Sequence, residues 1–219
     1  MKKGFFYAIL IAVIACTSGS LHAAAAPALD EIIGGVEKKY SAEGFSAHFL
    51  QTSTLKAMQV TEQAKGLLFA EKPDKMRWEY REPERQLVVS DGVNLWVYRP
   101  ADNQVMIGKA PAFFGDGKGA GFLSDIRRVR ENFDVTLEGT TEGSNYLLKL
   151  LPKKKTFDIA AIYLTISSSD FSIVEVTTLN EYRDETRIRL EDIQFRSDLD
   201  DSLFSFVVPD GADVVKMDQ

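Results

Sequence analysis

Residues 72–98, KPDKMRWEYREPERQLVVSDGVNLWVY, decide the fold class. Met76, Trp78 and Tyr80 alternate with charged residues, which is the period expected of a β-strand with one apolar face. The proline at position 83 then marks a turn before the next apolar run. Short strands divided by tight turns indicate an antiparallel sheet that curls toward a barrel.

The same pattern continues along most of the chain, so we expect a mainly β protein. We find no internal repeat, low-complexity tract or linker, and therefore expect a single domain over residues 27–219. The predicted strands are 45–49, 63–70, 76–81, 85–90, 94–99, 104–109, 133–138, 145–151, 159–167, 172–182, 185–195 and 204–208.

Two segments break the strand pattern. Residues 29–40 predict an amphipathic helix, which Gly34 and Gly35 weaken by roughly 1 kcal/mol each, so the helix must rest on an apolar surface. Residues 111–132 combine flexible glycines with a short helical pattern and predict a lid inserted between two halves of the sheet. The apolar face of the lid consists of Phe122, Leu123, Ile126 and Val129, with Arg127, Arg128 and Arg130 opposite.

The first 26 residues predict a secretory signal peptide. Two lysines precede an apolar run over residues 5–15, which is shorter than the roughly 20 residues that span a bilayer, and an alanine run follows at 23–26. Cleavage in the alanine run would release a soluble protein to the periplasm. The alternative is lipidation of Cys16, because residues 13–16, VIAC, resemble a lipobox.

Composition excludes several classes of function. Removal of residues 1–26 would leave 24 basic and 32 acidic residues, a net charge of −8, which disfavours nucleic acid and anionic lipid head groups as partners. No cysteine and one histidine, His48, would remain, so neither a disulfide framework nor a histidine-based hydrolase triad is expected. The glycines at 115–121 lack the ending of a phosphate-binding loop. We therefore expect no enzyme, no catalytic residue, no metal and no cofactor.

Three motifs resemble one family, the periplasmic outer-membrane lipoprotein carriers (LolA). They are GFSAHFLQ at 44–51, KPDKMRWEY at 72–80 and PERQLVVSDGVNLWVY at 83–98. The order of signal, helix, strands, lid and late strands is similar over nearly all of the mature chain, although the C-terminal third is similar in pattern only. The resemblance implies an unclosed antiparallel β-barrel, a half-barrel covered by helices with an apolar cavity between.

The resemblance also implies a function. A carrier of this family takes lipoprotein acyl chains from an inner-membrane ABC transporter and passes the lipoprotein to an outer-membrane receptor; a monomer is the default for a shuttle. The residues expected to line the cavity are Phe45, Phe49, Met76, Trp78, Tyr80 and Val88, with Phe122, Leu123 and Ile126 from the lid. Many members latch the lid with an arginine where this chain has Lys72, whose flexible point charge predicts a weaker latch.

Other interpretations remain open. A lipidated Cys16 would make the chain an outer-membrane lipoprotein receptor of the same fold. The same cavity would also suit an envelope sensor of lipids or lipoproteins, although such sensors usually carry a further interaction domain. The sequence also leaves open whether Trp96 and Tyr98 face the interior, because Leu95 and Val97 compete for that face.

Overall fold

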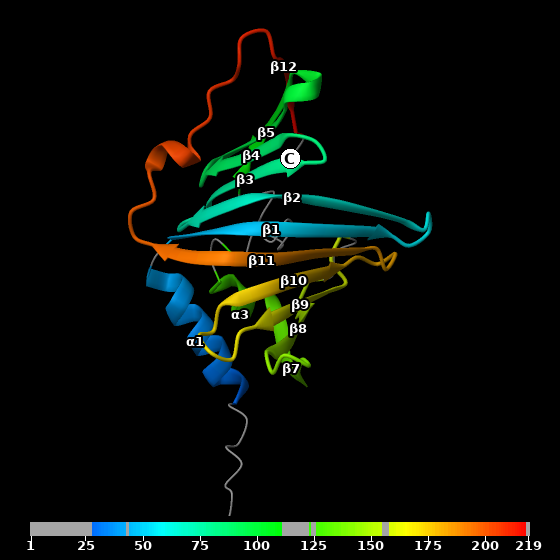
Figure 1. The fold of residues 1–219 in the computed structure, drawn as a ribbon, viewed down its shortest axis with the longest axis vertical. Helices are drawn as coiled ribbons and strands as arrows, with labels where there is room; N and C mark the ends of the chain where they lie inside the picture. The colour runs from blue at the N-terminus through cyan, green and yellow to red at the C-terminus, as the bar shows by residue number, and fades with distance from the viewer. Residues whose placement is uncertain (1–27, 43, 111–122, 124–125, 155–157, 218–219) are drawn as a thin grey trace, which may run out of the picture.

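The structure, a computed structural model, describes residues 28–42, 44–110, 123, 126–154 and 158–217. Twelve strands of these ranges form one sheet in the order β12-β6-β5-β4-β3-β2-β1-β11-β10-β9-β8-β7, and the edge strands β12 and β7 do not pair with each other (Figure 1). The strands are β1 (Gly44–Leu55), β2 (Val60–Glu71), β3 (Lys75–Glu82), β4 (Gln86–Asp91), β5 (Asn94–Arg99), β6 (Gln104–Lys109), β7 (Phe133–Thr140), β8 (Tyr146–Pro152), β9 (Ala161–Ile166), β10 (Ile173–Leu179), β11 (Glu185–Arg196) and β12 (Asp213–Lys216). The helical elements are α1 (Leu29–Ala42), η1 (Pro100–Asp102), α3 (Arg128–Asn132) and η3 (Asp201–Phe204).

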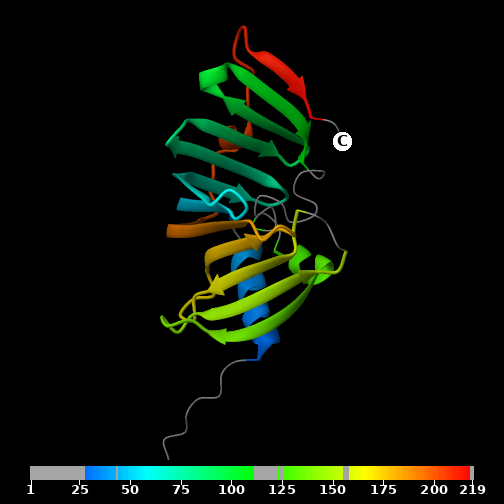
Figure 2. The same ribbon diagram turned by 90° about the vertical axis from the view of Figure 1, so that its right-hand side faces the viewer.

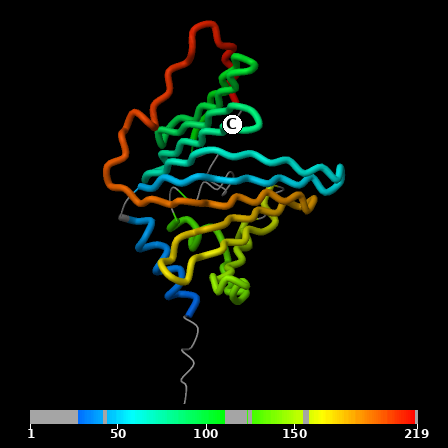
Figure 3. The backbone as a smooth tube through the Cα atoms, viewed as in Figure 1, coloured from blue at the N-terminus to red at the C-terminus, as the bar shows by residue number. Residues whose placement is uncertain are grey.

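The two halves of the sheet meet where β1 pairs with β11, strands that lie far apart in sequence. β1 also pairs with β2, and the β1–β2 hairpin extends farther than its neighbours (Figure 3). The predicted unclosed, mainly antiparallel sheet is therefore confirmed. One pair differs, because β12 runs parallel to β6.

The predicted strand at 204–208 is wrong. Its first residue ends η3, and the chain then continues without regular structure until β12 begins at Asp213. Phe206 of this segment packs on the outside of the sheet instead: its ring lies 6.2 Å from Trp96 and 5.7 Å from Tyr98, centroid to centroid. Trp96 and Tyr98 therefore point away from the interior, which Leu95 and Val97 occupy.

The predicted helix at 29–40 is confirmed as α1, around which the β7–β11 half of the sheet curves (Figure 2). Ile32, Val36 and Tyr40 on its inner face are buried in the main apolar core. Gly35 has a packing role, since a Cβ there would lie 2.6 Å from the ring of Phe171 in the β9–β10 turn, whereas a Cβ at Gly34 would meet nothing within 4 Å.

These two glycines should respond in opposite directions to alanine. Gly34→Ala should raise the free energy of unfolding by up to about 1 kcal/mol through helix propensity. Gly35→Ala should lower it by about 1–3 kcal/mol, because the methyl group collides with Phe171. Urea unfolding of both variants tests this difference, and equal stabilisation would show that Phe171 does not pack on α1.

Candidate functional site

The interior face of the sheet is rich in aromatic side chains. Phe49 lies at the centre, with ring centroids 4.9 Å from Trp78 and 4.9 Å from Tyr80, both in edge-on geometry. Phe45 lies four residues before Phe49 on the same face of β1 and contacts Tyr40 of α1 with a centroid distance of 5.3 Å. These contacts join β1, β3 and α1 into one apolar interior.

The structure brings the six strand residues predicted for the cavity onto this single face. Phe45, Phe49, Met76 and Trp78 are each at most 4% exposed. Tyr80 and Val88 are half-buried against the same core, and Val88 lies directly across from Trp78 in the β3–β4 pair. The six side chains therefore share one face of the sheet. Their contact with an acyl chain stays a prediction.

The lid residues that the structure describes cover the same interior. Leu123, Ile126 and Val129 are buried in the core, whereas Phe122 lies outside the described residues. Within the described part of the lid, the α-helix is confined to α3, which is shorter than the pattern predicts. α3 also reaches α1, because Arg130 donates to Asp30 and Glu37.

A partly buried ion pair joins the lid to the sheet. Arg128 Nη2 donates to Asp74 Oδ2 at 2.6 Å, and the two side chains are 25% and 9% exposed. Asp74 occupies the β2–β3 turn, where Ser90 Oγ donates to its backbone carbonyl at 2.7 Å. The second terminal nitrogen of Arg128, Nη1, is buried with no hydrogen-bond partner within the described ranges. Arg128 therefore binds Asp74 through one terminal nitrogen only, and this contact is weaker than a bidentate one.

Lys72, the predicted latch residue, makes no hydrogen bond or ion pair with the described part of the chain. The structure instead places the cation on the lid, at Arg128, and the carboxylate in the turn, at Asp74. The sequence does not predict this role for either residue, since the helical pattern places Arg128 on the face opposite the apolar one. One feature of the sequence could have indicated this contact: Asp74, an acidic residue, follows Pro73 in the same motif that contains Lys72.

Loss of this ion pair should cost more than loss of an exposed one. Arg128→Met should lower the free energy of unfolding by about 2 kcal/mol, because a charged hydrogen bond to a buried carboxylate disappears. Arg130→Met should cost less than about 1 kcal/mol, because Arg130 is itself 41% exposed and its partners Asp30 and Glu37 are 87% and 27% exposed. Urea denaturation measures both, and similar losses would show that the Arg128–Asp74 pair contributes no more to stability than the contacts of Arg130.

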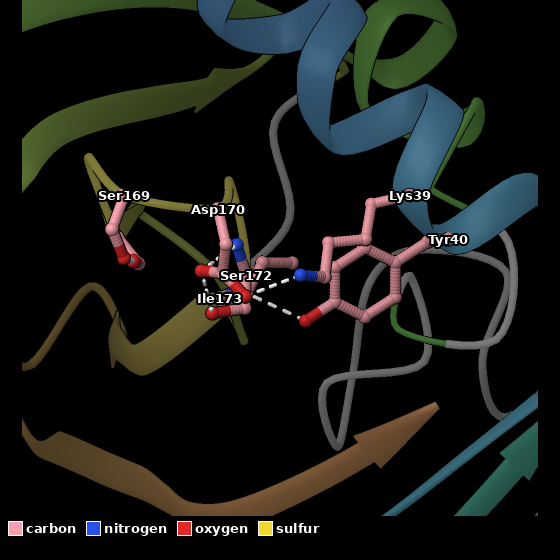
Figure 4. A network of polar contacts seen from close by, with 7 residues as sticks. Lys39, Tyr40, Ser169, Asp170, Ser172 and Ile173 are labelled. Atoms are coloured by element: carbon pink, nitrogen blue, oxygen red, sulfur yellow. Dashed lines mark hydrogen bonds and ion pairs between the residues drawn. The ribbon is translucent and has the colours of Figure 1, made fainter. Parts of the chain in front are cut away.

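α1 is held over the interior by a small polar network with the β9–β10 turn (Figure 4). The backbone N–H of Ile173 donates to the Tyr40 hydroxyl at 2.9 Å, and Lys39 donates to Asp170. Burial raises the pKa of Tyr40 above its ordinary value. The pKa of Asp170 is lowered: partial desolvation opposes this shift, but hydrogen bonds from Lys39 and Ser172 outweigh it.

Removal of the Tyr40 hydroxyl should therefore loosen α1. Tyr40→Phe leaves the buried N–H of Ile173 without an acceptor, which should lower the free energy of unfolding by about 1–3 kcal/mol. Tyr182→Phe is the matched control, because Tyr182 is 73% exposed and should change stability by less than about 0.5 kcal/mol. Thermal unfolding compares them; a silent Tyr40→Phe variant would exclude the hydroxyl as an anchor.

A polar hollow of about 530 Å³ adjoins the aromatic residues. The Tyr80 hydroxyl donates to Gln51 Oε1 at 3.0 Å at its edge, and burial raises the pKa of Tyr80 to about 12. The hollow is lined by Gln51, Ser53, Glu62, Gln63, Ala64, Tyr80, Pro83, Glu84 and Gln86.

The described residues offer little for catalysis. His48 is exposed, faces away from Phe45 and Phe49, and lies 3.2 Å from Asp192. No group of three or more histidine, cysteine or acidic side chains in the described ranges could hold a metal ion. None of the helices in those ranges is both long enough and apolar enough to cross a membrane.

Comparison with known proteins agrees with this architecture. Residues 40–207 match the family described as "Outer membrane lipoprotein carrier protein LolA". The chain belongs to the LolA family. An outer-membrane lipoprotein carrier protein of Chromobacterium violaceum is 29% identical over 218 residues and covers all of both chains. Another, from Dechloromonas aromatica, is 30% identical over 169 residues, 77% of this chain and 79% of its own length.

Solved structures support the fold alone. An uncharacterised protein of Thermus thermophilus superposes with a TM-score of 0.56 at 18% identity, over 86% of this chain and 98% of its own. MucB superposes with a TM-score of 0.50 at 14% identity, over 85% of this chain and 64% of its own. Both identities are too low to transfer a function.

Proposed function

We propose that the chain is a periplasmic carrier that binds lipoprotein acyl chains between the sheet and its covers. Residues 1–26 would serve as the signal peptide and residues 27–219 as the carrier domain. The carrier would receive its cargo from an inner-membrane ABC transporter and release it to an outer-membrane receptor. Membership of the LolA family supports this role over the Cys16-anchored receptor, because the curated relatives described above carry the name of the carrier.

The observation that carries the proposal is the way in which the apolar interior is covered. Leu123, Ile126 and Val129 close it from the lid, and the described lid is joined to β-strand turns and to α1 by side-chain contacts such as Arg128–Asp74. An acyl chain could replace the lid side chains against Phe49 and Trp78. Transfer from water favours such burial by roughly 0.8 kcal/mol per methylene.

The two tryptophans of the chain provide a direct test, because Trp78 faces the interior and Trp96 faces the outside. The ligand is a synthetic diacyl lipopeptide with bromine atoms on its acyl chains, which quench tryptophan fluorescence on close contact. The Trp96→Phe variant, which retains Trp78, should be quenched strongly. The Trp78→Phe variant, which retains Trp96, should be quenched several-fold less.

Equal quenching of the two variants would mean that the acyl chains bind the outside or bind without a defined site. Absence of quenching in both would exclude this interior as the binding site. A non-brominated lipopeptide controls for changes of tryptophan environment that come from lid movement alone.

A further inference from the structure

The interior face changes from apolar to polar along the strands. On β1, the inward residues Phe45, Ala47 and Phe49 are followed on the same face by Gln51 and Ser53. The β3–β4 pair repeats the change, because Trp78 opposite Val88 is followed by Tyr80 opposite Gln86. The polar hollow of about 530 Å³ begins where the apolar face ends.

Tyr80 lies at the boundary between the two regions. Its ring packs on Phe49, and its hydroxyl donates to Gln51 at 3.0 Å. A ligand with apolar chains and a polar head would therefore find matching surfaces in continuous order, with its chains near Phe49 and its head beyond Tyr80.

The charge of the hollow selects among such ligands. Its lining includes the carboxylates of Glu62 and Glu84 and no lysine, arginine or histidine. Its remaining polar groups include the amides of Gln51 and Gln86 and the hydroxyl of Ser53, which can donate to and accept from esters and peptide groups. A phosphate group placed there would meet negative charge without a compensating cation.

We propose that this hollow binds the uncharged ester-and-amide head of an acylated polypeptide N-terminus and disfavours lipids with anionic phosphate heads. The inference rests on the proposed function and adds the basis of its selectivity. Acyl chains of the two lipid classes are alike, so the aromatic interior cannot distinguish them. The distinction must be made at the head, and Glu62 and Glu84 make it by repulsion.

The test compares uptake of two lipids with identical chains. Phosphatidylcholine vesicles carry equal small amounts of dipalmitoyl phosphatidylglycerol and of a dipalmitoyl lipopeptide with an acetylated N-terminus and an uncharged peptide. After incubation, the lipids recovered with the soluble mature protein are quantified by mass spectrometry. The variants are Glu62→Gln/Glu84→Gln and, as a charge-matched control, Glu138→Gln/Glu142→Gln on the distant β7–β8 hairpin.

The ratio of phosphatidylglycerol to lipopeptide should be low for the wild type and should rise about three-fold or more in Glu62→Gln/Glu84→Gln, as expected for the loss of two exposed like-charge repulsions. It should also rise with salt in the wild type, because salt screens exposed charges. An unchanged ratio in Glu62→Gln/Glu84→Gln, or an equal rise in the control, would overturn the selectivity while leaving the carrier role intact. No recovery of lipopeptide by the wild type would overturn the carrier role itself.

Discussion

The interior face of the sheet cannot cover itself, and the rest of the structure follows from that constraint. An unclosed sheet with Phe45, Phe49, Met76 and Trp78 on its inner side needs another apolar surface against it. α1 supplies that surface for one half of the sheet and the lid for the rest. Side-chain hydrogen bonds such as Tyr40–Ile173 and Arg128–Asp74 tie these covers to the strands and their turns. Backbone bonds from Phe133 and Lys153 tie the end of α3 to β7 and to the end of β8.

The alternation of side chains along each strand determines which residues face the interior and which face the outside. Because side chains two residues apart share a face, one register fixes both the apolar interior around Phe49 and the polar hollow beyond Gln51. The same alternation places Trp96 and Tyr98 outside, where the segment containing Phe206 covers them. Near β5 the sheet is thus covered on both sides: the apolar core lies on the inner side and the segment that contains Phe206 lies on the outer side.

Most strands and the shared face of the aromatic residues could be predicted from the sequence. The predictions failed where the structure depends on tertiary contacts. Alternation was sufficient for most strands and for the shared face of Met76, Trp78 and Tyr80, because one side of those strands is apolar and the other charged. It was insufficient at 94–98, where both faces are apolar because both are covered. It also misassigned 204–208, since apolar residues that pack on a sheet need not belong to it. The Arg128–Asp74 contact depends on tertiary distance, which local pattern does not contain.

The strength of the Arg128–Asp74 contact would suit the proposed carrier role. A bidentate arginine pair with every donor satisfied would hold the lid firmly, and entry of an acyl chain would have to overcome that stabilisation. Arg128 instead pairs through one nitrogen, and its Nη1 has no hydrogen-bond partner among the residues that the structure describes. An unsatisfied buried donor raises the free energy of the closed state. Under the proposed carrier role, this would lower the free energy needed to displace the described part of the lid, and burial of acyl methylenes, at roughly 0.8 kcal/mol each, would offset that cost.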